Sequence, residues 1–110
     1  MSLPTITRGT TPAVTVVVPM DLTEFSCYLS IGKKARTPWF TADNTQMEAA
    51  YGENESTLIF TFTQEQTLMC KPGEAYIQLR VIKDDLAIAS DMAKITIADI
   101  IKDGEIVDEF

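Results

Sequence analysis

The sequence TLIFTFTQEQTLMCKPGEAYIQLRVIK, residues 57–83, carries the two clearest strand patterns in the chain. Apolar residues recur at every second position over residues 57–62 and again over residues 74–83, which is the period of a strand with one buried face. We therefore expect two adjacent strands whose apolar faces form one continuous surface, with the rest of the chain packed against them. The core residues that this pattern predicts are Phe60, Phe62, Ile77 and Leu79.

A short helical turn is expected between those two strands. Thr63 stands three residues before Gln66, which is the spacing of a capping box at a helix start. The sequence Lys71-Pro72-Gly73 then ends the helix, because proline cannot continue it and glycine favours a turn. The central stretch is thus predicted to be a strand, a helical turn and a second strand.

Further β-prone segments flank this centre. Residues 41–51 fit either a helical turn beginning near Asp43 or a strand. We favour the strand, because with a turn at residues 52–55 it makes a hairpin over residues 46–63. The other segments expected to form strands are residues 3–8, 13–18, 25–31, 37–40, 86–89 and 93–97. Together they predict an all-β protein, an immunoglobulin-like β-sandwich of about seven strands with one short helical turn.

Length and composition favour one domain over residues 1–110. The 110 residues are 45% hydrophobic and 23% charged, which is the composition of a globular protein. No apolar run approaches the ~20 residues that a membrane helix needs, and no secretory signal pattern opens the chain. We therefore expect a cytosolic origin and no membrane partner. Met1-Ser2-Leu3 fits an expression leader, with the natural sequence resuming near Pro4.

The charge balance indicates the kind of partner. Nine basic and sixteen acidic residues give a formal net charge of -7. Such a charge repels a phosphate backbone, so nucleic-acid binding is not expected and other proteins are the expected partners.

Reactive residues are scarce in this sequence. The chain has no histidine, so neither a Ser-His-Asp nor a Cys-His pair can form. Neither a GxGxxG nor a GxxxxGK[ST] phosphate loop occurs. The acidic residues that remain as candidates for catalysis lie in or beside predicted turns, where they serve solvation and capping: Glu65, Glu74, Asp84, Asp85 and Asp91. We expect no enzyme activity, no catalytic residue and no cofactor.

The two cysteines, Cys27 and Cys70, have no CxxC neighbour, which argues against a zinc site and any other bound metal. Cys27 falls on the apolar face of the strand expected over residues 25–31, so we interpret it as an inert core thiol. A disulfide between the two cysteines stays open at this point, although cytosolic assembly disfavours it.

The last stretch, residues 98–110, combines five large apolar residues with five acids. It is too apolar for a free tail, yet Gly104 and the acids prevent a sustained helix. We interpret it as a C-terminal attachment segment that binds either its own domain or another chain, with a solvated tail as the alternative. The residues expected to make the contact are Ile100, Ile101, Ile106, Val107 and Phe110.

Three short stretches carry a resemblance to a known family. They are TITRGTTP at residues 5–12, FTQEQTL at residues 62–68, and IQLRV at residues 77–81 running on to Ala89-Ser90-Asp91. They resemble the "I-x-R-G-T-T-P", "L-T-Q-E-x-T-L" and "I-Q-x-R … A-S-D" elements of small proteins encoded in the tail modules of phages and prophages of Gram-positive bacteria. The chain is also similar to the N-terminal β-sandwich of upper baseplate proteins.

The resemblance implies a structural or assembly role in a phage tail or baseplate. It further implies a virion location after assembly in the host cytoplasm and other tail or baseplate proteins as partners. If the C-terminal segment binds another copy of the chain instead, the contact would form a homo-oligomer, symmetric or ring-forming. The resemblance transfers no catalytic residue. Two departures are Phe62, where the family pattern has Leu or Val, and the stiffer sequence Lys71-Pro72-Gly73.

The alternative function is a host-side carbohydrate-binding or adhesin-like β-sandwich module, since the same fold serves both. A carbohydrate site needs an exposed aromatic platform. The aromatic residues to inspect for such a platform are Tyr28, Trp39 and Tyr76.

Overall fold

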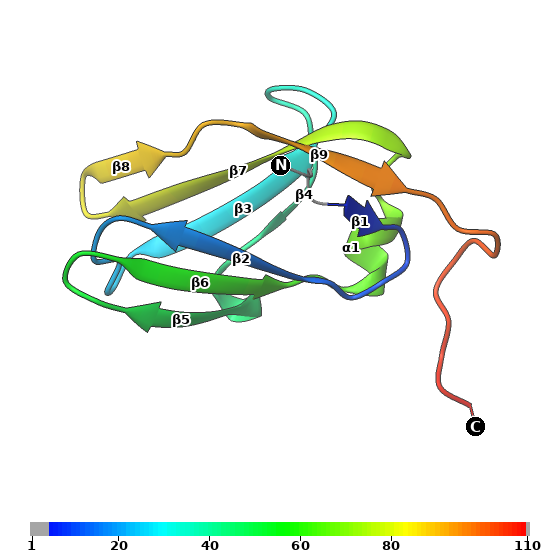
Figure 1. Cartoon of the computed structure of the whole chain (residues 1–110), viewed down its shortest axis with the longest axis horizontal. Coiled ribbons are helices and arrows are strands. Elements are labelled where there is room, and N and C mark those ends of the chain that lie inside the picture. The colour runs from blue at the N-terminus through cyan, green and yellow to red at the C-terminus, as the bar shows by residue number, and fades with distance from the viewer. Residues whose placement is uncertain (1–4, 110) are drawn as a thin grey trace.

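The structure, a computed structural model, describes residues 5–109 and is built from two β-sheets that face each other (Figure 1). The larger sheet has six strands: β1 (Thr5–Thr7), β3 (Ser26–Gly32), β4 (Pro38–Ala42), β7 (Gly73–Lys83), β8 (Leu86–Ala89) and β9 (Ala93–Ala98). The smaller sheet has the order β2-β6-β5, with strands β2 (Ala13–Val18), β6 (Ser56–Thr61) and β5 (Met47–Tyr51). Two short helices, η1 (Asn44–Gln46) and α1 (Gln64–Leu68), lie in the connections. The expectation of an all-β fold is confirmed, with nine strands among the described residues rather than about seven.

Side chains from both sheets fill the space between them. Leu29 and Ile95 of the larger sheet and Leu58 and Phe60 of the smaller one are almost fully buried. Alternation along each strand puts these residues on the inner face, where burial of apolar surface stabilises the fold. Phe62 follows β6 and meets Phe40 of β4 edge to face, with ring centroids 5.0 Å apart.

The expected pairing of the two central strands is wrong. Strand β6 belongs to the smaller sheet and β7 to the larger one, so Phe60 and Leu79 lie on facing sheets and not on neighbouring strands. Ile77 is only partly buried, because it borders an open side of the space between the sheets. The physical reason is the connection through α1, which is long enough to carry the chain from one sheet to the other.

The predicted capping box at the start of α1 is confirmed. The Thr63 hydroxyl accepts a hydrogen bond from the Gln66 amide (3.1 Å), and the Gln66 side chain accepts one from the Thr63 amide (3.0 Å). The side-chain amide of Gln66 also forms two hydrogen bonds with the side-chain amide of Gln46, at 2.6 and 2.9 Å. Gln46 ends η1, so both readings of residues 41–51 hold in part: a helical turn at 44–46 leads into β5, which forms the expected hairpin with β6.

Strands β8 and β9 pair with the same side of β7 and are separated by a bulge. Residues 78 and 79 of β7 lie opposite residues 90–92, so the opposing chain holds one residue more. At the bulge, Ser90 supplies the hydrogen bonds that a paired strand would make to Leu79. Its amide donates to the Leu79 carbonyl (2.8 Å), and its hydroxyl accepts from the Leu79 amide (3.0 Å).

The chain crosses between sheets near its start. Strand β1 pairs in parallel with β9 of the larger sheet, whereas β2 pairs with β6 of the smaller one. Gly9 lies at the crossing with a φ of 73°, a left-handed conformation that glycine adopts without strain. The strand expected over residues 3–8 is observed as Thr5–Thr7, and residues 3 and 4 lie outside the described residues.

Replacing Leu79 with alanine tests the inward face of β7. Leu79 is 5% exposed, so we expect Leu79→Ala to lower the free energy of unfolding by about 2–5 kcal/mol. Ile82 points to the opposite face of β7 and is 43% exposed, and Ile82→Ala should cost about 1 kcal/mol or less. Chemical denaturation of both variants measures the difference, and equal losses would contradict the assignment of faces.

Candidate partner-binding site

The C-terminal attachment segment, which the structure describes from residue 98 to residue 109, leaves the end of β9 and passes α1 (Figure 1). Beyond Ala98, the last residue of β9, it has no regular secondary structure up to residue 109. Ile100 is half-buried, whereas Ile101 is 106% exposed, Val107 73% and Ile106 59%. The segment therefore exposes most of its apolar side chains to the solvent. Polar contacts hold its backbone in place.

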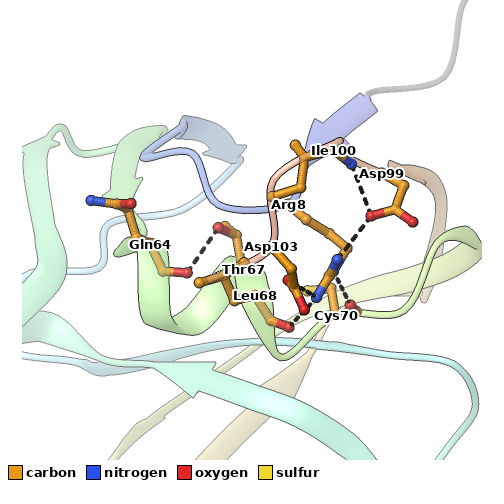
Figure 2. A network of polar contacts seen from close by, with 8 residues as sticks. All are labelled: Arg8, Gln64, Thr67, Leu68, Cys70, Asp99, Ile100 and Asp103. Atoms are coloured by element: carbon orange, nitrogen blue, oxygen red, sulfur yellow. Dashed lines mark hydrogen bonds and ion pairs between the residues drawn. The ribbon is translucent and has the colours of Figure 1, made fainter. Parts of the chain in front are cut away.

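The first anchor of the segment is the guanidinium group of Arg8, which follows β1 (Figure 2). It donates hydrogen bonds to the carbonyl oxygens of Cys70 (Nε, 2.9 Å) and Leu68 (Nη2, 3.1 Å). It also binds the carboxylates of Asp99 (Nη1, 2.8 Å) and Asp103 (Nη2, 3.2 Å), both in the segment. One side chain thus connects the end of α1 to the C-terminal segment.

The chemistry of these partners suits an arginine. The last carbonyls of a helix lack partners within the helix and attract cationic donors. The planar guanidinium reaches several acceptors at once, which an ammonium on a single nitrogen does not. The hydrogen bond to Asp99 raises the pKa of Arg8 above its ordinary value. The backbone amide of Ile100 and then the Arg8 guanidinium lower the pKa of Asp99, so both groups are charged at neutral pH.

The loop after Arg8 packs against α1 and the segment. The Thr67 hydroxyl donates to the carbonyl of Thr10 at 2.9 Å. A Cβ at Gly9 would lie 3.1 Å from Cδ1 of Ile100 and 3.5 Å from Cδ2 of Leu68, so these side chains occupy the space beside the glycine. Ile100 is consequently an apolar residue of the segment that contacts the domain.

The second anchor is Gln64, the first residue of α1. Its Nε2 donates to the carbonyl of Ile106 and its Oε1 accepts from the amide of Ile106, both at 2.9 Å. The side-chain amide therefore pairs with a peptide group as a neighbouring strand would. Because this contact uses only the backbone of Ile106, the side chains of Ile106 and Val107 stay exposed.

The structure separates the five apolar residues expected to bind a partner. Ile100 contacts the chain's own domain, and Ile101, Ile106 and Val107 face the solvent. Phe110 lies outside the described residues. Arg8 and Gln64, which hold the segment, were not predicted.

Neither metal nor membrane features occur in the described part of the chain. Over residues 5–109 there is no group of three or more side chains placed to hold a metal ion, and no helix long and apolar enough to span a membrane. Cys27 and Cys70 are free and buried. Burial raises the pKa of both thiols, that of Cys70 to about 11, so neither is poised as a nucleophile.

A scan against protein-family models and a search of curated proteins returned no match to this chain. A function must therefore be argued from the fold, the anchored segment and the sequence resemblance.

Replacing Gln64 with alanine tests the second anchor. Two hydrogen bonds of about 1 kcal/mol each correspond to a change of about thirtyfold in an opening equilibrium. We expect hydrogen exchange at the Ile106 amide to accelerate by about that factor. Gln64→Glu keeps the acceptor for the Ile106 amide but loses the donor to the Ile106 carbonyl. In this variant the exchange rate of the Ile106 amide should therefore lie between those of the wild type and Gln64→Ala. Unchanged exchange in Gln64→Ala would show that the segment is held elsewhere.

Acidification tests the first anchor. Because the pKa of Asp99 is lower in the folded chain than in the unfolded chain, its contribution is present above the unfolded value and is lost as the pH falls through the folded value. We expect NMR relaxation of the segment amides to report increased motion only below about pH 4. In Asp99→Asn the Arg8 contact is weakened at every pH, so the transition should be smaller. A transition of equal size in Asp99→Asn and in the wild type would contradict the role of this ion pair.

Proposed function

We propose that this chain is a non-enzymatic structural or assembly protein of a phage or prophage tail or baseplate, built on an immunoglobulin-like β-sandwich. The strand order supports the fold part of the proposal. The smaller sheet, β2-β6-β5, corresponds to strands B-E-D of an immunoglobulin domain, and β9-β7-β3 corresponds to G-F-C. The antiparallel pairs β2–β6 and β3–β7 join the strands that are neighbours in that topology.

The observation that carries the proposal is that two of the three family-like stretches form one structural unit. Arg8 in residues 5–12 binds the carbonyl of Leu68 in residues 62–68. Thr67 donates to Thr10, and the Phe62 amide donates to the Pro12 carbonyl at 3.0 Å. Through these contacts the two stretches together fix α1 against the crossing between the sheets and hold the C-terminal segment.

The anchored segment supports a role in assembly. Exposed apolar side chains concentrated on one segment are typical of protein–protein contact sites. Ile101 and Val107 are more than 70% exposed on a segment whose backbone is fixed at Ile106. A prearranged segment loses less conformational entropy on binding than a free tail does. Its partners in this proposal are other tail or baseplate proteins, in virions assembled in the host cytoplasm.

The carbohydrate-binding alternative finds less support. Trp39 packs against the core, Tyr76 is partly buried, and Tyr28 is 42% exposed. These three residues do not offer the set of exposed rings that a sugar-stacking platform needs.

Deleting the gene from an inducible prophage tests the proposal. We expect particles with absent or malformed tail tips by electron microscopy, restored by the wild-type gene. The paired change Ile101→Ser and Val107→Ser should fail to restore them, because it removes the exposed apolar contacts. The control pair Val17→Ser and Leu86→Ser removes side chains that are 54% and 53% exposed elsewhere, and it should restore assembly. Normal infectious particles without the gene would refute a structural role in the virion.

A further inference from the structure

The outer face of the larger sheet holds a continuous hollow, which we term the basic groove. It consists of two adjoining depressions of about 380 Å³ and about 570 Å³. The residues that line both are Ser30, Pro38, Arg80 and Ala89, from strands β3, β4, β7 and β8. Arg80 therefore lies where the two depressions meet.

The charge of the groove is opposite to that of the whole protein. Lys34 and Arg36 line one depression together with Arg80, and no residue lining either depression is acidic, although the chain holds sixteen acids. Among residues 5–109, the ion pairs involve none of these three bases. Ile82 and Ile88 add apolar surface to the other depression. The groove thus combines unpaired positive charge with apolar contact surface.

The C-terminal attachment segment has the complementary character. Residues 105–109 read EIVDE, in which Ile106 and Val107 are exposed. Within the described chain no ion pair involves Glu105 or Glu109. The segment therefore presents acids beside apolar side chains, which is what the groove would accept.

The segment cannot occupy the groove of its own chain while its anchors hold. Gln64 fixes the backbone of Ile106 beside α1. Figure 1 shows the segment running past α1 toward the side of the smaller sheet, whereas the groove lies on the outer face of the larger sheet. Glu105 and Ile106 are thereby kept beside α1, and residues 107–109 extend at most about 10–11 Å from Ile106, since an extended chain covers about 3.3–3.6 Å per residue.

We propose that the C-terminal attachment segment of one copy binds in the basic groove of a second copy. The contact joins two different surfaces, so repeating it gives a closed ring or an open filament and not a symmetric dimer. This contact between copies is separate from the proposed role in tail assembly, which involves other proteins. It can be tested with the purified protein alone.

Two complementary variants test this contact. Arg80→Glu reverses charge in the groove and leaves the segment intact, whereas Glu105→Lys with Glu109→Lys reverses the segment and leaves the groove intact. Sedimentation velocity over rising protein concentration should show association of the wild type that weakens with added salt. Each variant alone should associate at least about tenfold more weakly. An equal mixture should give a dimer and nothing larger, because it contains one working groove and one working segment per pair.

Matched controls separate the groove from net charge. Lys71→Glu, and Glu53→Lys with Glu55→Lys, make the same charge changes at exposed positions outside both surfaces and should associate as the wild type does. Thermal melting checks that each variant folds, and Arg36→Glu replaces Arg80→Glu if the latter does not. A wild type that stays monomeric to its solubility limit, variants that associate as the wild type does, or a mixture that stays monomeric would each overturn the proposal.

Discussion

The arrangement of α1, the sheet crossing and the C-terminal segment depends on the hydrogen bonds and ion pairs of the Arg8 guanidinium group. Its side chain is 15% exposed and reaches two carbonyl oxygens of the α1 end and two carboxylates of the C-terminal segment. Arg8 also continues the parallel pairing of β1, because its amide donates to the carbonyl of Ala98 at 3.0 Å. One residue therefore links the sheet crossing, the helix and the segment.

The sequence predicted the strands and the hairpin of β5 with β6, but it placed β6 and β7 in one sheet, which is wrong. Alternation of apolar residues is a local property, so the inward faces of β3, β7 and β9 could be assigned from residues such as Leu29, Leu79 and Ile95. Which sheet a strand joins depends on the connection before it. The stretch through α1 moves the chain from β6 to the facing sheet, and no periodicity within β6 or β7 reports that change.

The C-terminal segment was predictable from its composition, whereas its anchors were not. Its mixture of isoleucines and acids indicated a contact, but Arg8 lies 91 residues before Asp99 and Gln64 lies 42 residues before Ile106. Contacts at such separations leave no local pattern. The one available signal for the Arg8 contact was charge. Arg8 is the only basic residue in residues 5–12, and the C-terminal segment holds five acids.

The buried thiols determine how the protein responds to its redox surroundings. Burial raises the pKa of Cys70 to about 11, so its thiol stays protonated at neutral pH, whereas the thiolate is the form that attacks disulfides and reacts with oxidants. Cys27 is equally enclosed, with a relative exposure of 0%. While the chain stays folded, both thiols should therefore react only slowly with disulfides and oxidants in an oxidising compartment.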